Sequence, residues 1–322
     1  GDVYKRQAYV NDGMDPNTNG LGYRYDWSYD VQGKPVLNGI SMRKYLDGAG
    51  TTPAADTDWF DKTTRTGVVQ NYNVAVSSGS DRHSSYFSLG YYKNLGIIKT
   101  SDFDRYSARM NTEYKLIKDV LTVGEHFTLS RTSEVQAPGG FLENVLQFNP
   151  SLPVYTESGT YAGPVGGYPD RENPVARLYR NSDNRYVYWR TFGDAYINLH
   201  LFKGFNLRST FGLDYAQKQQ RFFTYPITEG TVANSKNAVE AKQEHWTKWM
   251  WNAVATYNLQ AGLHRVDAMA GIELNREDDN YFSGYKEDFL ILNPTYMWPD
   301  AGTGTAPVSY THLRAHETVL DL

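Results

Sequence analysis

The fold of this chain is decided by the stretch at residues 105–114, which reads Arg105-Tyr106-Ser107-Ala108-Arg109-Met110-Asn111-Thr112-Glu113-Tyr114. One alternate set of residues is apolar, aromatic or threonine, and the other carries two arginines and a glutamate. Successive side chains of a strand point to opposite faces, so this stretch predicts a strand with one apolar and one charged face. In a soluble sandwich the charges point outward to water, whereas in an outer-membrane barrel they line a wet lumen and the apolar face meets lipid.

The same alternation recurs before and after this stretch, which predicts about eight strands in all. For example, Phe205, Leu207 and Phe211 alternate with Asn206 and Arg208. The expected strands are 69–77, 86–92, 105–114, 121–130, 187–199, 205–214, 248–257 and 265–274. Glu125 is an exception, because it lies on the apolar parity of its strand, and Met250 and Val254 weaken the alternation at 248–257.

The connections between these strands alternate in length. Short turns follow the first, third, fifth and seventh strands, and longer excursions follow the others, among them 132–184 and 216–243. Short turns on one rim and long loops on the other are typical of an outer-membrane barrel. We therefore predict an all-β fold, an antiparallel up-and-down meander that forms part of a transmembrane β-barrel.

The composition agrees with a sheet that faces lipid on one side and water on the other. Of 322 residues, 40% are hydrophobic and 15% aromatic, with 26 tyrosines and a mean hydropathy of -0.60. Tyrosine and tryptophan suit membrane interfaces because they combine an apolar ring with a polar tip. The net charge of -4, without a basic stripe, gives no reason to expect nucleic acid as a partner. The chain has no cysteine and no apolar run of about 18 residues that would form a transmembrane helix.

The two ends depart from the composition of the rest. Residues 1–7 and 308–322 resemble translated adapter sequence, and the chain starts without methionine, so we expect an internal fragment. Residues 8–68 are rich in Gly, Asp, Asn and Thr and predict an extracellular loop segment with short ordered pieces. We expect the partial barrel at 69–275 and a further extracellular loop at 276–307.

Several runs, in this order, resemble a known family. They include Thr57-Asp58-Trp59-Phe60-Asp61, the run 70–80 (QNYNVAVSSGS), the run 96–106 (GIIKTSDFDRY) and Asn173-Pro174-Val175-Ala176. Over about residues 57 to 275 the chain resembles the SusC/RagA-type TonB-dependent outer-membrane transporters. The resemblance implies a 22-stranded barrel with an amino-terminal plug, a TonB box and a SusD-like lipoprotein partner. Neither plug nor TonB box is found in this sequence, so contact with the TonB complex would pass through a missing amino-terminal region.

The resulting functional hypothesis is a fragment of a Gram-negative outer-membrane importer of oligosaccharide or peptide, embedded in outer-membrane lipid. The alternative is a secreted β-sandwich that binds glycans or mediates adhesion, with loop aromatics such as Tyr155, Tyr161, Tyr168 and Trp298 stacking on sugars. The apolar parity separates the two hypotheses, because it faces outward in a barrel and forms a dry core in a sandwich. The residues that decide are Tyr106, Met110, Phe127, Leu129, Phe211 and Ile272.

The charged parity supplies the candidate functional residues. These are expected to face the lumen: Arg105, Arg109, Glu113, Arg190, Asp194, Arg208, Asp214, Lys248, Arg265, Asp267 and Glu273. Both signs alternate without a focused patch, which favours pairing across neighbouring strands and contact with the plug over direct contact with solute.

Chemistry other than transport has little support in the sequence. Asp15, Asn17, Asn19 and Asp26 match the first, third, fifth and twelfth positions of a calcium loop, although a plain Asn/Gly turn explains the same residues. His312 and His316 have helical spacing but lack the glutamate of a zincin motif. We find no catalytic arrangement, expect no cofactor other than this candidate calcium, and predict that the chain is not an enzyme.

Overall fold

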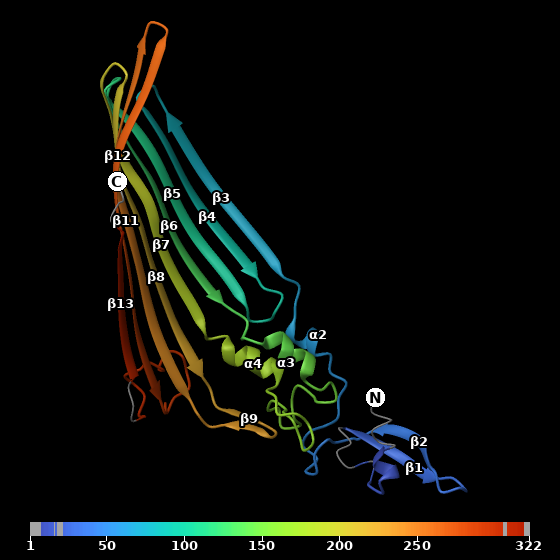
Figure 1. Cartoon of the computed structure of the whole chain (residues 1–322). Helices are drawn as coiled ribbons and strands as arrows, with labels where there is room; N and C mark the ends of the chain where they lie inside the picture. The colour runs from blue at the N-terminus through green and yellow to red at the C-terminus, as the bar shows by residue number, and fades with distance from the viewer. Residues whose placement is uncertain (1–7, 16, 18–21, 305–307, 319–322) are drawn as a thin grey trace.

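The computed structural model describes residues 8–15, 17, 22–304 and 308–318, the last range as backbone. Its main element is one antiparallel sheet of nine strands (Figure 1). Neighbours in the sheet are consecutive in sequence, apart from a small hairpin between β8 and β11. The strands are β3 (Val68–Gly79), β4 (His83–Leu95), β5 (Asp102–Ile117), β6 (Leu121–Val135), β7 (Arg185–Phe202), β8 (Phe205–Thr224), β11 (Ala238–Ala261), β12 (His264–Glu287) and β13 (Val308–Thr318).

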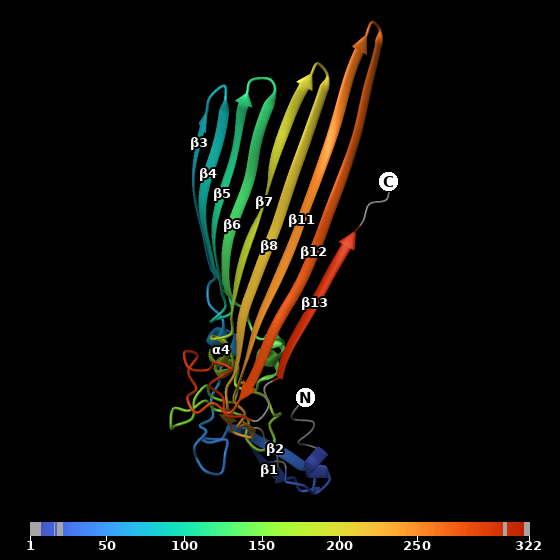
Figure 2. The ribbon, with the colours of Figure 1, turned by 90° about the vertical axis from the view of Figure 1, so that its left-hand side faces the viewer.

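The sheet confirms the predicted all-β meander. Its outermost strands, β3 and β13, are not paired with each other, so the sheet is an open part of a barrel. Short turns lie together at one end and the long connections at the other (Figure 2). Two of these turns place Gly204 and Gly262 at φ +84° and +63°, a left-handed conformation that glycine adopts without steric cost. Residues 1–7 lie outside the described residues, and 308–318 pair with β12 as a strand.

Several strands are longer than the expected ten or so residues. Strands β11 and β12 each have 24 residues, and β8 runs to Thr224. The expected excursion at 216–243 therefore shrinks to 225–237, and the third long loop begins at 288 instead of 276. The sequence hides these extensions because polar residues such as Gln217 and Gln219 replace the apolar members of the alternation. Pairing with the next strand nevertheless continues without interruption.

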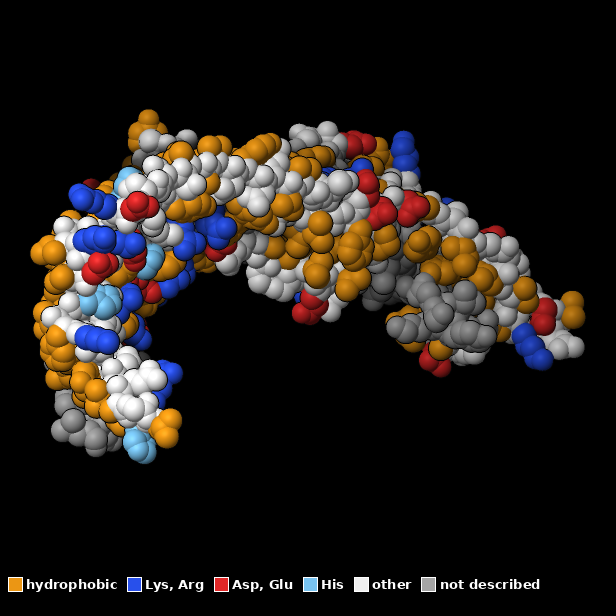
Figure 3. Space-filling view, turned by 90° about the horizontal axis from the view of Figure 1, so that it is seen from above, with side chains coloured by type: hydrophobic (Ala, Val, Ile, Leu, Met, Phe, Trp, Pro, Cys, Tyr) orange, Lys and Arg blue, Asp and Glu red, His pale blue; other side chains and the backbone are white. Residues whose placement is uncertain are grey.

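One face of the sheet carries the apolar parity. The strand register places all six deciding residues, Tyr106, Met110, Phe127, Leu129, Phe211 and Ile272, on this face. Tyr106 is 52% exposed, Phe211 48% and Ile272 49%, although a sandwich requires them in a dry core. Figure 3 shows hydrophobic side chains along the outer edge of the curved sheet, with charged side chains toward its inner side. The sandwich alternative is therefore wrong for this sheet, and we call the apolar side the convex face.

The apolar belt on the convex face crosses the strands obliquely. The ladder row that contains Tyr106 and Trp189 continues to Gln217 on β8 and Asn280 on β12. On β12 the apolar residues instead lie nearer the turns, around Ile272. Strands of a membrane barrel are tilted by about 40°, so a belt parallel to the bilayer must step along the ladder from strand to strand.

The long connections fold into a compact body with a hydrophobic core of its own. It holds the helices α2 (Trp59–Thr63), α3 (Phe141–Gln147) and α4 (Pro174–Asn181). The core consists of Trp59, Phe141, Val145, Phe148, Leu152, Val165, Tyr168, Val175 and Leu178. Beyond it lies a two-stranded hairpin, β1 (Tyr23–Tyr29) with β2 (Pro35–Met42) (Figure 1). We call this assembly of connections the loop body.

A second, smaller core attaches the segment 288–304 to the loop end of the sheet. Phe289 and Met297 of this segment pack against Phe223 on β8 and Val239 on β11. The small hairpin of β9 (Ile227–Glu229) and β10 (Val232–Asn234) closes the connection between those two strands. No helix among the described residues is long and apolar enough to span a membrane.

Candidate functional site

The face opposite the apolar belt carries the candidate residues, and we call it the concave face. The strand register puts all eleven on it: Arg105, Arg109, Glu113, Arg190, Asp194, Arg208, Asp214, Lys248, Arg265, Asp267 and Glu273. They follow the curve from β5 to β12 instead of gathering at one point. The geometry therefore resembles a polar wall more than a single binding pocket.

Opposite charges on this face pair across neighbouring strands. Arg190 on β7 donates two hydrogen bonds to Asp214 on β8, at 2.9 and 2.5 Å. Further along the sheet, Lys248 lies 3.5 Å from Glu277. A bidentate arginine–carboxylate pair fixes both side chains, which lowers their freedom to follow a passing solute. These pairs support the structural interpretation of the charges.

A denser cluster joins β5, β6, β7 and β8 near the short turns. The hydroxyl of Tyr196 donates to Glu113 at 2.6 Å, and the guanidinium of Arg208 lies 4.0 Å from the centre of the same ring. The Tyr196 ring lies across Gly124, where a Cβ atom would come within 2.5 Å of it. A glycine at this position therefore gives the ring the space to cross β6 and reach Glu113 on β5.

The same cluster includes a histidine that the sequence did not single out. His126 lies 3.2 Å from Asp194, and its ring stacks on Tyr196 at 5.8 Å between centres. Neither Tyr196 nor Gly124 was predicted as a functional residue. The sequence indicated only that both residues lie on the same face as the charged residues. It did not indicate their contacts, because a contact between residues on different strands depends on the register of the sheet.

Other candidates have weaker surroundings. Arg105 lies over the ring of Tyr92 at 5.8 Å. Arg109 donates to Asn111 at 3.4 Å. Arg265 and Asp267 pair along their own strand beside an exposed turn, where an ion pair contributes little to stability. Glu273 stands opposite Asn252 in the ladder.

The chain is similar in sequence to several known proteins. No protein-family model matches the chain. A TonB-dependent receptor of Formosa agariphila is 28% identical over 224 residues, which are 68% of this chain and 22% of that receptor. The TonB-dependent receptor SusC of Bacteroides thetaiotaomicron is 25% identical over 285 residues, 78% of this chain and 27% of SusC. The chain is related to the SusC/RagA-type TonB-dependent transporters.

The solved structures agree with this relationship at the level of the fold. The RagAB peptide importer in its 'closed-closed' state superposes with a TM-score of 0.66, covering 83% of this chain and 31% of that one, at 17% identity. The 'open-open' state gives a TM-score of 0.67. The chain thus spans about a quarter of its curated SusC-type relatives and belongs to an outer-membrane β-barrel. These relatives are named as receptors and the solved neighbour as an importer, in agreement with the prediction that the chain is not an enzyme.

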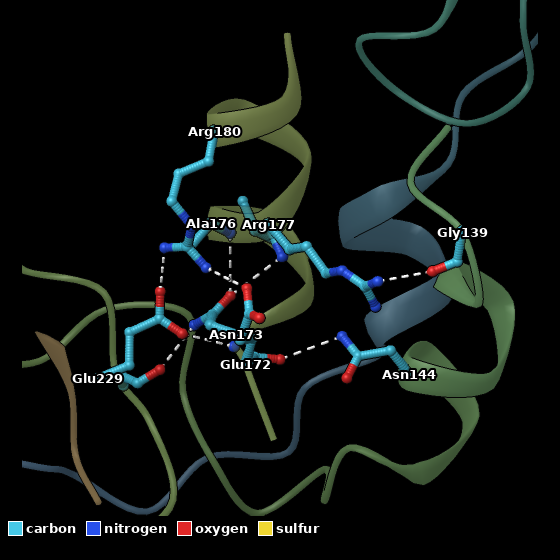
Figure 4. Close-up of polar contacts among 10 residues, drawn as sticks. Gly139, Asn144, Glu172, Asn173, Ala176, Arg177, Arg180 and Glu229 are labelled. Atoms are coloured by element: carbon cyan, nitrogen blue, oxygen red, sulfur yellow. Dashed lines mark hydrogen bonds and ion pairs between the residues drawn. The ribbon is translucent and has the colours of Figure 1, made fainter. Parts of the chain in front are cut away.

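The loop body is locked by one buried carboxylate. Glu229 of β9 is 2% exposed, accepts from the backbone N–H of Asn173 at 2.7 Å and pairs with Arg180 of α4 (Figure 4). Arg180 also donates to Glu172 at 2.7 Å. Burial disfavours the charged guanidinium, but the two carboxylates outweigh it and raise the pKa of Arg180. At Gly163 a Cβ atom would lie 2.0 Å from the Glu229 carbonyl oxygen, so only glycine allows this close approach.

Most of the loop aromatics that were considered for sugar stacking are engaged within the loop body. The hydroxyls of Tyr168 and Ser151 lie 2.6 Å apart. Tyr155 and Tyr161 stack at 5.2 Å, and burial together with Tyr155 raises the pKa of Tyr161 to about 12. The guanidinium carbon of Arg221 lies 3.9 Å from the centre of the Trp298 ring. Tyr168 is buried, whereas Tyr155 and Trp298 remain 48% and 49% exposed.

The calcium prediction remains untested. The side-chain oxygen of Asn17 accepts the backbone N–H of Tyr25 at 2.7 Å, and the Asn17 N–H bonds to Asp15 at 2.8 Å. Asn19 lies outside the described residues, and Asp26 lies on β1. Within the described ranges, no three His, Asp or Glu side chains are grouped to hold a metal ion.

The exception at Glu125 has a local partner. Glu125 stands directly opposite Thr112 in the ladder, on the convex face, and the threonine hydroxyl donates to its carboxylate. The pair lies near the short turns of β3–β4, beside Ser78 and Ser85. The next row toward the turns, Tyr114, Val123 and Ile197, is again apolar or aromatic, so the pair is a local polar contact within the belt.

Proposed function

We propose that this segment is part of the barrel wall of an outer-membrane nutrient importer. The observation that carries the proposal is the two-faced curved sheet, with exposed apolar side chains outside and paired charges inside. Lipid contacts the convex face in this arrangement, and the concave face borders a wet lumen. The loop body and residues 8–68 lie on the extracellular side, at the rim opposite the short turns.

The concave charges have a mainly structural role in this proposal. Pairs such as Arg190–Asp214 keep the lumen wall polar and rigid, and the cluster around Tyr196 faces the plug domain. Net charge is close to balanced along the face, so solute is not attracted by one sign. The plug and its contact with the TonB complex are expected in the amino-terminal region of the complete protein.

The partner and the substrate class are inferred from the resemblance to this family. A SusD-like lipoprotein is proposed to cover the loop body, whose internal core and Glu229 lock provide a rigid platform. The substrate is an oligosaccharide or a peptide. The related solved structure is named a peptide importer, which gives peptide the more specific support.

Deletion of the complete gene tests this function. Uptake of labelled oligosaccharides and of labelled peptides is measured in the parent strain, the deletion strain and a strain without TonB. We expect the deletion and the TonB-less strain to lose uptake of the same solute class. Recovery of the complete protein in the soluble secreted fraction, with uptake of both classes unchanged, contradicts the proposal.

A further inference from the structure

We propose that the convex face carries a binding site for lipid A, the phosphorylated and acylated glycolipid of the outer leaflet. In this site Arg131 binds a phosphate group and the apolar groove beside it holds an acyl chain. The site faces lipid and takes no part in solute passage, so it goes beyond the proposed import function.

The groove lies where β3 to β7 cross the part of the apolar belt nearer the long loops. It has a volume of about 570 Å³ and is open along its length. Ala108 forms part of its floor, and its small side chain leaves space between Leu89 and Leu129, its neighbours in the ladder. The next row toward the turns continues with Phe87, Met110 and Phe127. A hollow of this shape accepts a hydrocarbon chain that runs along the belt.

An aromatic row borders the groove on the side of the long loops. Tyr72, Tyr91, Tyr106, Arg131 and Trp189 follow one another across five strands in a single ladder row. The rings of Tyr91 and Tyr106 are 4.8 Å apart, and the guanidinium of Arg131 lies 5.8 Å from the centre of the Trp189 ring. Tyrosine and tryptophan mark the interface of a barrel with the lipid headgroups. Arg131 thus lies at headgroup level.

Arg131 differs from Arg185 and Arg276 on this face in having no acidic partner. Arg185 pairs with Asp102 at 2.9 Å, and Arg276 pairs with Asp278 at 2.9 Å. Within the described part of the chain, no carboxylate lies within the 4.0 Å ion-pair distance of Arg131. An arginine in this position has its fork of N–H donors available for an anion from outside, and phosphate matches that fork in two hydrogen bonds.

The depth of Arg131 in the membrane and the leaflet that it faces indicate which anion can reach it. The row next to that of Arg131 on the side of the loops contains the polar residues Lys93, Asp104 and Ser133. Long loops mark the extracellular rim of a barrel, so the row lies in the outer leaflet. The lipid with phosphate and several acyl chains in that leaflet is lipid A. A phosphate at Arg131 and a chain over Ala108 use both parts of the site at once.

The test uses the complete transporter purified in detergent, with bound lipid counted by native mass spectrometry. The probes are lipid A, phosphatase-treated lipid A and phosphatidylglycerol. Arg131→Gln removes the cation, and Ala108→Leu fills the groove. Arg105→Gln is the matched control, because Arg105 lies on the neighbouring strand at a similar level but on the concave face. Heat-dependent gel mobility verifies that each variant is folded.

We expect Arg131→Gln to weaken lipid A binding about tenfold, the effect of losing one charge-assisted contact at an interface. Phosphatase treatment should weaken binding to the unaltered protein by a similar factor, and Ala108→Leu should weaken binding of both forms of lipid A. Arg105→Gln should leave binding unchanged. Equal losses for Arg131→Gln and Arg105→Gln, no effect of phosphatase, or equally tight binding of phosphatidylglycerol would each overturn the assignment. If Arg131→Gln fails to fold, the phosphatase comparison and Ala108→Leu still decide.

Discussion

Replacement of Glu229 by glutamine tests whether one buried carboxylate holds the loop body together. The glutamine keeps the shape of the side chain but cannot carry the charge that Arg180 requires. Glu229 is 2% exposed, and it connects the β9–β10 hairpin to the first turn of α4 through Asn173. Breaking a buried ion pair costs about 3–5 kcal/mol. Since Arg180 keeps Glu172, we expect the lower end, about 3 kcal/mol.

A loss of about 3 kcal/mol raises the equilibrium constant for local opening of this region about a hundredfold. The assay is amide hydrogen exchange of α4 and of residues 225–237 in the complete transporter. Glu172→Gln is the matched control, because Glu172 binds the same arginine but its side chain is 35% exposed. An exposed pair contributes about 0–1 kcal/mol, so the control should change exchange less than about fivefold. Equal acceleration in both variants, or none in Glu229→Gln, would refute the reasoning.

Three further predictions test the sheet and the loops. Gly124→Ala should displace the Tyr196 ring from β6 and lower the stability of the folded barrel by about 1–3 kcal/mol. The measurement is the temperature of the heat-dependent gel shift, which should fall. Gly139→Ala is the control, because Gly139 has open space around it. Two variants each keep a single tryptophan, Trp249 or Trp246. Lipids with brominated chains should quench the fluorescence of Trp249 but not that of Trp246, because the ladder puts the two side chains on opposite faces of the sheet. Equal quenching in both variants contradicts the assignment of the faces. Burial opposes the charge of Asp47, but hydrogen bonds from Thr51 and Thr52 outweigh it and lower its pKa from 3.8 to about 2. Its contribution is therefore complete above about pH 4 and lost as the pH falls toward 2, so exchange of the Thr51 amide should accelerate over that window; no such change should occur in Asp47→Asn.

The sequence predicted the strands of the apolar belt well because a strand at a lipid–water boundary repeats every two residues. At Arg105 to Tyr114 each side chain meets one of two very different solvents, and the alternation is strict. Beyond the belt that constraint ends, so the extensions of β8, β11 and β12 were missed. Helix α4 was also missed, although Asn173 followed by Pro174 matches the start of a helix, a capping side chain before a proline at the first helical position.

The candidate site was predictable as a face but not as a set of contacts. Parity alone assigns Arg190 and Asp214 to the same side, but only the register shows that they pair. Glu229 gave no signal in the sequence, because its partners Asn173 and Arg180 lie about 50 residues earlier in the chain. Glu125 was noticed as an exception and explained only by Thr112 opposite.

The sequence by itself determined that this chain forms a two-faced antiparallel meander with alternating loop lengths, since local alternation and turn spacing suffice for that. The tertiary structure decided which contacts use those faces. It set the oblique course of the apolar belt, which depends on strand tilt, and the crossing of Tyr196 over Gly124, which depends on register. It also left Arg131 without an acidic neighbour, whereas Arg185 and Arg276 on the same face are paired. Contacts between strands depend on distances through space, and no local pattern of residues records them.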